Sequence, residues 1–219
     1  MQEETVIVVA GGGPPDPRVP PELPDGARVV AADQGLEHAV ALGLRVDVAV
    51  GDFDSASPAA VEAAEAAGVR IERHPPEKDA TDLELALDAA AALGAARIVV
   101  LGSDGGRLDH LVAGMLGASA ERYAAIELDA LLGAATVHVV RGSRRLQGEP
   151  GELLSLLAVN GPAEGVATAG LKYPLRGETL AAGSSRGVSN VFSGREAIVT
   201  VERGVLLAIR PGRQSEEAL

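Results

Sequence analysis

The sequence predicts an α/β domain with a mainly parallel sheet, followed by an antiparallel β-sandwich domain. Two observations predict the first domain. Short β-branched runs without polar alternation are typical of strands buried on both faces, and Ala- and Leu-rich segments with helical spacing lie between these runs. Such an alternation of strands and helices favours a parallel sheet. The third observation is a change after about Arg141, beyond which short apolar runs alternate with turn-forming residues and show no helical period.

The expected elements follow in chain order. Strands are expected over Thr5–Ala10, Ala27–Ala32, Val46–Val50, Val69–His74 and Arg97–Leu101. Helices are expected over Leu36–Leu42, Pro58–Ala67 and Leu83–Leu93. In the second half the apolar runs LLSLLAV, AIVTV and VLLAI are separated by NGP, GLKYP, AAGSS and ERG, which is typical of strands joined by turns.

These patterns give domain boundaries. The α/β domain is expected over residues 1–141, and a linker over 142–150, where Gly, Pro and charged residues cluster. The β-sandwich is expected over 151–213, and the polar tail 214–219 is expected to fray.

Composition excludes several classes of function. The chain has 219 residues, enough to bury a sizeable core, and no cysteine, which excludes disulfides and thiolate metal sites. Its 31 acidic against 19 basic residues give a net charge of −12, which disfavours nucleic acid and anionic membranes as partners. No stretch approaches the ~20 apolar residues that span a bilayer, and the start lacks the basic segment of a signal peptide, so we expect a cytoplasmic protein. An anionic substrate would have to arrive with a metal.

Aspartates gather at the expected carboxyl ends of the strands. Asp33 follows VVAA, Asp52 and Asp54 follow VDVAVG, Asp82 precedes a helix, and Asp109 lies beyond RIVVLGSDGG. Ligands of open α/β sheets bind outside these strand ends, so the carboxylates are expected to converge. Oxygen ligands suit a hard cation such as Mg²⁺. Any single one of these aspartates is equally consistent with a turn former or a helix N-cap.

Two of these motifs carry further detail. In GDFDS, Asp52 and Asp54 are two residues apart, so an extended segment would point both carboxylates the same way, as metal ligands. In KDATDLE, Thr81 is expected to cap the helix and Glu84 to close a capping box, which is compatible with Asp82 reaching into the cleft.

Two glycine-rich segments are candidates for phosphate contact. In GSDGGRLDH, Gly105 and Gly106 would let backbone amides approach an anion, Arg107 suits phosphate oxygens, and Asp109 stands at a helix start. The loop Gly11–Arg18 (GGGPPDPR) is interpreted as a plain surface loop in preference to a phosphate contact. No GxxxxGK[ST] motif is present, so ATP would have to bind without that phosphate cradle.

Six motifs in order resemble the thiamine pyrophosphokinase family: ADQG (32–35), GDFDS (51–55), KDATDLE (78–84), GGRLDH (105–110), GLKYPL (170–175) and GVSN (187–190). The resemblance spans both halves of the chain. It implies an N-terminal domain for ATP and metal, a C-terminal domain for thiamine, and a homodimer whose active sites are shared between subunits.

The resemblance also implies roles for individual residues. Mg²⁺ would be held by Asp52, Asp54 and Asp82, and Asp33 and Asp109 would complete a catalytic acidic cluster. Lys78 and Arg107, next to Gly105 and Gly106, would meet the triphosphate of ATP.

For thiamine, Ser189 and Asn190 would hydrogen-bond the aminopyrimidine, and the ring of Tyr173 would stack on the ligand, where its face also suits the thiazolium cation. Some relatives have Trp in place of Tyr173, and many have Gly in place of Gln34. These three thiamine-contact residues could equally be ordinary turn residues of their own domain.

The reaction that the resemblance implies is attack of the thiamine hydroxyl on the β-phosphorus of ATP, with AMP leaving. Such a transfer asks a protein mainly for positioning and charge neutralisation. Asp109 or Asp33 would accept the hydroxyl proton. Two alternatives stay open: a pyrophosphokinase acting on another hydroxymethyl heterocycle such as a pterin, and a non-catalytic thiamine-binding or thiamine-sensing protein.

Overall fold

The computed structural model describes residues 4–18 and 23–212. Within them the chain forms two compact units. The first unit comprises the residues up to Ala118 together with Ala125–Gly133, and the second comprises Ser119–Ala124 and the chain from Ala134 onward.

The first unit is built on a parallel sheet with the strand order β6-β5-β1-β2-β3-β4. The strand bounds are β1 (Thr5–Val9), β2 (Arg28–Ala32), β3 (Val48–Gly51), β4 (Arg70–Arg73), β5 (Arg97–Gly102) and β6 (Glu127–Leu132). The central strands β1 and β5 are apolar and buried along almost their whole length. This is the expected consequence of covering both faces of a parallel sheet.

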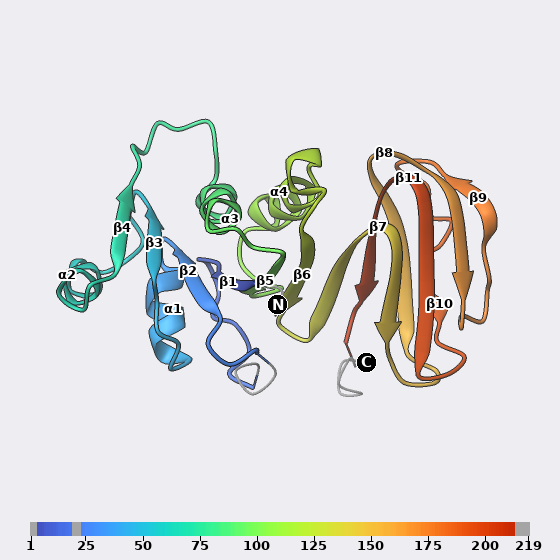
Figure 1. Cartoon of the computed structure of the whole chain (residues 1–219), viewed down its shortest axis with the longest axis horizontal. Helices are drawn as coiled ribbons and strands as arrows, with labels where there is room; N and C mark the ends of the chain where they lie inside the picture. Colours follow the sequence, from blue (N-terminus) through green and yellow to red (C-terminus); the bar gives the residue numbers. More distant parts are fainter. Residues whose placement is uncertain (1–3, 19–22, 213–219) are drawn as a thin grey trace. The chain divides into compact units, whose positions relative to one another are not determined.

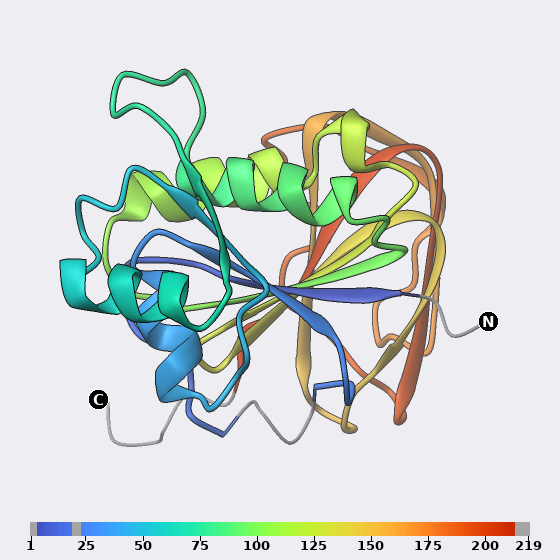
Figure 2. The ribbon, with the colours of Figure 1, turned by 60° about the vertical axis from the view of Figure 1, so that its left-hand side comes forward.

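Helices cover both faces of this sheet. The pair α1 (Gly35–Ala41) and α2 (Pro58–Ala66) lies on one face, and the pair α3 (Asp82–Ala92) and α4 (Leu108–Ala118) lies on the other (Figures 1 and 2). The predicted cap of α3 is confirmed, because Thr81 Oγ1 accepts a hydrogen bond from Glu84 N at 3.2 Å. A capped start fixes where the first turn of α3, and with it Asp82, stands.

The second unit is antiparallel throughout, with the order β10-β8-β11-β7 and β9 paired to β8 (Figure 1). It contains the short 3-10 helix η2 (Glu121–Tyr123), β7 (Ala135–Gln147), β8 (Leu153–Ala169), β9 (Arg176–Leu180), β10 (Asn190–Val191) and β11 (Glu196–Arg210). The strand β11 shifts register near Gly204 against both of its neighbours, β7 and β8. A Cβ at Gly204 (φ 93°) would stand 2.4 Å from Pro162 O, so this irregular point in the strand requires glycine. Buried apolar side chains, among them Leu156, Phe192 and Leu206, form the core of this unit.

The predicted fold class is confirmed, and every strand and helix predicted for the first domain is present with ends within two residues. The predicted linker over 142–150 is wrong, because β7 runs through Ala135–Gln147 and the chain passes to the second unit at Gly133 and Ala134. In the part of this segment that belongs to β7, the glycine and the charged residues lie on a strand with an exposed face. Polar residues are normal on such a face. The tail 214–219 lies outside the described residues. None of the described helices has the length and apolar character to cross a membrane.

Candidate active site

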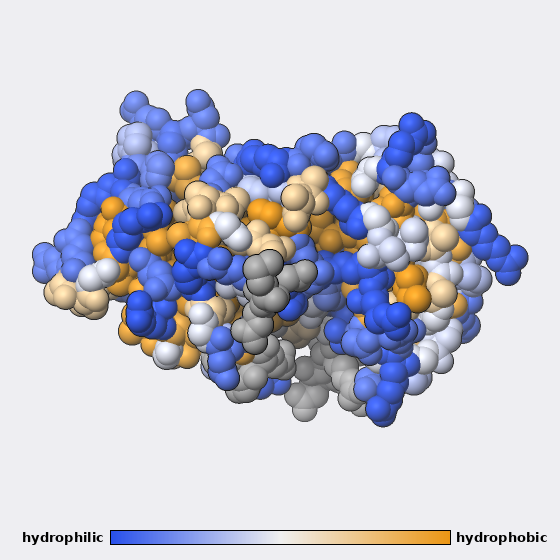
Figure 3. All heavy atoms as spheres, in the orientation of Figure 1, coloured by the Kyte–Doolittle hydropathy of each residue, from blue (hydrophilic) through white to orange (hydrophobic). Residues whose placement is uncertain are grey.

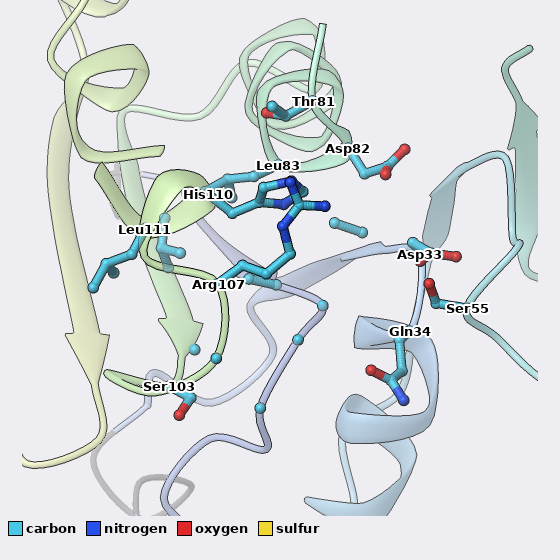
Figure 4. A pocket seen from close by; sticks show the side chains of 18 of the residues that line it. Asp33, Gln34, Ser55, Thr81, Asp82, Leu83, Ser103, Arg107, His110 and Leu111 are labelled. Atoms are coloured by element: carbon cyan, nitrogen blue, oxygen red, sulfur yellow. The ribbon is translucent and has the colours of Figure 1, made fainter. Parts of the chain in front are cut away.

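A pocket of about 680 Å³ lies in the first unit at the carboxyl ends of the parallel strands. Its wall includes Gly11 after β1, Asp33 after β2, Asp52 after β3 and Ser103 after β5. Figure 4 shows Asp33, Ser55 and Asp82 on one side of the pocket, with Ser103 and Arg107 on the other. Its volume is within the range of about 300–1,000 Å³ typical of sites for small molecules.

Asp33 is held in a strained turn between β2 and α1. Its φ is +48°, which is uncommon for a residue other than glycine, and its N–H donates to Val50 O at 2.9 Å. The residue is 8% exposed, and its Oδ1 is buried without a hydrogen-bond partner in the described part of the chain. Burial, reinforced by the negative charge of Asp82, raises the pKa of the Asp33 carboxyl. A buried carboxylate oxygen of this kind is well suited to a cation.

The GDFDS segment does not have the extended conformation predicted from its sequence. Phe53 between the two aspartates has φ +59° and is buried, so the alternation expected of an extended chain does not hold there. The structure brings Asp52 into the pocket beside Lys78 and leaves Asp54 exposed, with its Oδ1 accepting a hydrogen bond from Ser55 Oγ at 2.9 Å. Both aspartates line the pocket.

Three carboxylates converge in the pocket. One oxygen from each of Asp33, Asp52 and Asp82 lies within 4.8 Å of the others. The close approach depends on Gly51, because a Cβ there would stand 3.2 Å from both Asp33 Cβ and Asp82 Oδ1. The carboxylate cluster thus joins Asp33 to Asp52 and Asp82, whereas Asp54, predicted as the third magnesium ligand, lies outside it.

Lys78 lies within this cluster. Its Nζ is 3.0 Å from Asp52 Oδ2 and 2.9 Å from Asp82 Oδ1, and its side chain is 12% exposed. Burial opposes the charge on Lys78, but hydrogen bonds to Asp82 and Asp52 outweigh it and raise the pKa of the ammonium. The same hydrogen bond from Lys78 lowers the pKa of Asp52. Lys78 therefore neutralises part of the charge that the three carboxylates concentrate.

The loop after β5 presents Arg107, Gly105 and Gly106 to the pocket, as predicted. Arg107 is paired with Asp109, with Nη2 to Oδ2 at 2.6 Å and Nε to Oδ1 at 3.2 Å, and both side chains are exposed. The hydrogen bond from Arg107 lowers the pKa of Asp109 to about 2. Among the described residues, Asp109 belongs neither to the pocket wall nor to the carboxylate cluster, so its predicted place in that cluster is not supported.

Several wall residues were not predicted from the sequence. Gln34, Ser55, His110 and an apolar side formed by Leu83 and Leu111 all line the pocket. The pocket is also lined by Gly11, Gly12 and Gly13, which were predicted to belong to a plain surface loop. Three glycines directly after a central parallel strand were the signal that could have placed them there.

The predicted thiamine residues meet in a second, small pocket of about 130 Å³ in the second unit. Tyr173 is 53% exposed, and Lys172 Nζ lies 5.4 Å from the centroid of its ring. Ser189 is exposed with φ +58°, and its N–H donates to Ser155 Oγ at 3.1 Å. The volume is below the usual range for a ligand site, so these residues form part of a site at most.

Asn190 is bonded to the backbone around Tyr173. It is 2% exposed, its Oδ1 accepts hydrogen bonds from Tyr173 N at 3.0 Å and Val191 N at 2.9 Å, and its Nδ2 donates to Tyr173 O at 2.7 Å. These contacts give Asn190 a role in positioning Tyr173. Direct contact with an aminopyrimidine stays a prediction.

Comparisons with known proteins agree on one family. A family model described as "Thiamin pyrophosphokinase, catalytic domain" matches residues 23–123, and one described as "Thiamin pyrophosphokinase, vitamin B1 binding domain" matches residues 137–206. The chain is 26% identical over 222 residues to the thiamine pyrophosphokinase of Bacillus subtilis (strain 168). The match covers 94% of this chain and 98% of that protein.

Solved structures give the same result. A crystal structure of thiamin pyrophosphokinase from Geobacillus thermodenitrificans is 26% identical with a TM-score of 0.80, covering 97% of this chain and 99% of that one. The Bacillus subtilis structure has a TM-score of 0.81 at 22% identity, covers 96% of this chain and 100% of that chain, and shows the same fold. The two domain matches lie in the predicted order on the two halves of the chain, and the chain belongs to the thiamine pyrophosphokinase family.

Proposed function

We propose that this protein transfers a diphosphate group from Mg²⁺-ATP to the hydroxyl of thiamine, giving thiamine diphosphate and AMP. The observation that carries the proposal is the cluster of Asp33, Asp52 and Asp82 in a large pocket of the half that matches the family's catalytic domain. The match of the other half to the vitamin B1 binding domain favours thiamine over a pterin as the acceptor.

The residues present fit a magnesium ion. The cluster offers three carboxylate oxygens and no nitrogen or sulfur ligand, which is the donor set that Mg²⁺ prefers, and the buried Oδ1 of Asp33 has no protein partner in the described chain. Asp33, Asp52 and Asp82 would hold the ion, which when bound would neutralise phosphate charge and orient the phosphates. Asp54, on the same wall, stays a predicted ligand that the described geometry does not bring into the cluster.

The remaining pocket residues would act on the nucleotide. Arg107 is exposed on the opposite wall, and its guanidinium suits two phosphate oxygens at once, provided that it exchanges Asp109 for phosphate. While the pair with Arg107 stays closed, the low pKa of Asp109 makes it a weak base, so Asp109 would accept the hydroxyl proton only after Arg107 has exchanged it for phosphate. Positioning and charge neutralisation of this kind are what a diphosphate transfer requires.

A homodimer with shared active sites is part of the same proposal. The small pocket around Tyr173 needs further walls to enclose a ligand. In the first unit, Leu108, Val112 and Leu116 lie four residues apart on α4, so they share one face of that helix, and each is more than 40% exposed. Figure 3 shows apolar surface exposed among hydrophilic residues on the first unit. Apolar surface of this kind is what a second subunit would cover.

A cytoplasmic location completes the proposal. It is supported by the absence of cysteine in the sequence and by the small-molecule chemistry of the family.

The test is a turnover assay with thiamine, ATP and MgCl₂, with the nucleotide and thiamine products separated by chromatography. We expect AMP and thiamine diphosphate in equal amounts. ADP in equal amount with thiamine monophosphate would instead indicate a simple kinase, and thiamine binding without any turnover would indicate a binding or sensing protein. Light scattering tests the dimer, and a strictly monomeric active enzyme would refute shared sites.

A further inference from the structure

The proposed function gives no role to the three glycines after β1. Gly11, Gly12 and Gly13 line the same pocket as the carboxylate cluster. The match to the family's catalytic domain begins at residue 23, so it assigns nothing to this loop.

The glycine loop, defined as Gly11–Gly13, lies between the two sides of the pocket. A Cβ at Gly11 would stand 3.7 Å from Gln34 N, whereas a Cβ at Gly13 would stand 2.8 Å from Ser103 Oγ. In Figure 4 the chain after β1 passes between the labelled Gln34 and Ser103. The glycine loop therefore lies next to both the turn that carries Asp33 and the loop that carries Arg107.

The backbone amides of the glycine loop have no acceptor in the described chain. Ala10 N–H makes the last bond to β5, to Leu101 O at 2.8 Å, and beyond it no hydrogen bond is donated by the N–H groups of Gly11, Gly12 or Gly13. Gly12 has φ +88°, a conformation that aims neighbouring amides differently from those of a strand. Successive free amides in such a turn form a concave binding site for anions.

The chain after the glycine loop is stiff. Pro14 and Pro15 each fix one backbone dihedral angle, and Arg18 N–H donates to Asp16 Oδ1 at 2.9 Å. Stiff flanking residues reduce the entropy lost when the loop binds a ligand.

The charge pattern of the pocket indicates what the glycine loop binds. The cationic side chains Lys78 and Arg107 are each paired with carboxylates, whereas the amides of the glycine loop have no carboxylate partner among the described residues. We propose that the glycine loop is a backbone binding site for the phosphate groups of the nucleotide. This inference rests on the proposed function, and it assigns the central wall of the pocket to the polyphosphate, between the metal cluster and Arg107.

The test compares two substitutions at Gly12 that differ by one charge. A Cβ at Gly12 would meet no atom within 4 Å, and Asn and Asp are the side chains that best tolerate a positive φ. Gly12→Asn and Gly12→Asp therefore impose the same strain and size, while only Asp places a negative charge at the loop. The matched control is the same pair at Gly94, which has φ +83°, meets no atom within 4 Å and lies before β5, at the opposite end of the sheet.

Calorimetric titration of the full-length protein with Mg²⁺-ATP, AMP and adenosine gives the readout. We expect Gly12→Asp to bind Mg²⁺-ATP about tenfold or more weakly than Gly12→Asn. The negative charge introduced at position 12 would lie close to the phosphates and repel them. Adenosine should bind the two variants equally, and the two Gly94 variants should bind Mg²⁺-ATP equally.

Equal Mg²⁺-ATP affinities for the two Gly12 variants would overturn the inference, and so would an equal loss of adenosine binding, since the loop would then contact the nucleoside. If the Gly12 variants do not fold, Gly13→Ala replaces them. Its new Cβ would press on Ser103, so Mg²⁺-ATP affinity should fall, and Ser103→Gly in the same chain should restore part of it; unchanged affinity would again overturn the inference. Wild-type protein that binds no Mg²⁺-ATP would refute the proposed function, whereas normal turnover with insensitive loop variants refutes this inference alone.

Discussion

Replacing Lys78 with methionine tests whether this lysine is the internal counter-charge of the carboxylate cluster. Methionine keeps much of the length and apolar stem of the side chain and removes the ammonium, whose Nζ lies 3.0 Å from Asp52 Oδ2 and 2.9 Å from Asp82 Oδ1. The variant therefore leaves Asp33, Asp52 and Asp82 within 4.8 Å of one another without their cation.

The magnitude follows from the burial of these groups. Removing one partner of a buried ion pair costs about 3–5 kcal/mol of unfolding free energy. The lower end, about 3 kcal/mol, applies here because the Asp82 side chain is 29% exposed and partly solvated. For a chain of this length that loss corresponds to a melting temperature lower by about 6–12 °C.

The assay is thermal unfolding of wild type and Lys78→Met with EDTA and with MgCl₂. We expect the variant to melt well below wild type in EDTA and to gain more from MgCl₂, because the divalent ion supplies the missing positive charge. The control is Lys172→Met, since the sequence has only these two lysines and Lys172 is exposed. Its melting temperature should change by no more than about 2 °C. A Lys78→Met melting temperature equal to that of wild type in EDTA would refute the counter-charge role.

The pH dependence has a defined sign. The raised pKa of Lys78 means that its contribution to stability is present below the unfolded pKa of about 10.4 and is lost as pH rises through the folded value. The lowered pKa of Asp52 means that its contribution is present above about pH 3.9 and is lost as pH falls through the folded value. The stability gap between wild type and Lys78→Met should therefore persist from about pH 5 to 9 and shrink on both sides.

Three further substitutions test other parts of the two pockets. Asp33→Asn should abolish the rise in melting temperature that MgCl₂ produces, whereas Asp54→Asn, outside the cluster, should keep most of it; equal losses would restore Asp54 to the metal site. Gly51→Ala should lower the free energy of unfolding by about 1–3 kcal/mol and should reduce turnover strongly. Its Cβ would press on Asp33 and Asp82, and the backbone there has a conformation that suits glycine. Normal turnover would mean that the three carboxylates need not lie this close together. Tyr173→Ala should raise the KM for thiamine about 5- to 150-fold, because it removes about 1–3 kcal/mol of aromatic and cation–π contact. The KM for ATP should stay unchanged. An unchanged KM for thiamine would show that Tyr173 only packs against its own domain.

The sheet of the first unit was predictable where strands are apolar throughout, and not where a buried charge interrupts the pattern. β1 and β5 read as unbroken β-branched runs, and both were predicted. β6 was not among the predicted strands, because ELDALL carries an aspartate in its centre. Asp129 is nevertheless buried, 3% exposed, since Arg97 on the neighbouring strand donates to its Oδ2 at 2.8 Å. A buried charge needs a partner from elsewhere in the chain, and a linear pattern does not show that partner.

The acidic pocket was predictable from topology, because the carboxyl ends of parallel strands meet at one edge of a sheet. Which carboxylates share the cluster was not. That choice depends on the positive φ values of Asp33 and Phe53, and a bulky aromatic residue gives no sequence signal for such a conformation. The role of Asn190 was hidden for a similar reason, because its amide is bonded to the backbone of Tyr173, 17 residues away.

The charges of the pocket explain why a nucleotide would have to bring its own cation. The chain has a net charge of −12, and the lysine and the arginine among the described pocket residues are already paired, Lys78 with Asp52 and Asp82, and Arg107 with Asp109. A free triphosphate would meet an acidic wall whose cations are neutralised. A divalent ion carries twice the charge of the Lys78 ammonium and would neutralise the carboxylates in its place. The ammonium would then be free to face a phosphate. Arg107 would exchange Asp109 for another phosphate in the same way. On the proposed function, each internal ion pair would exchange one partner for a charge of the Mg²⁺-nucleotide, whereas the backbone amides of Gly11–Gly13 have no partner to displace among the described residues.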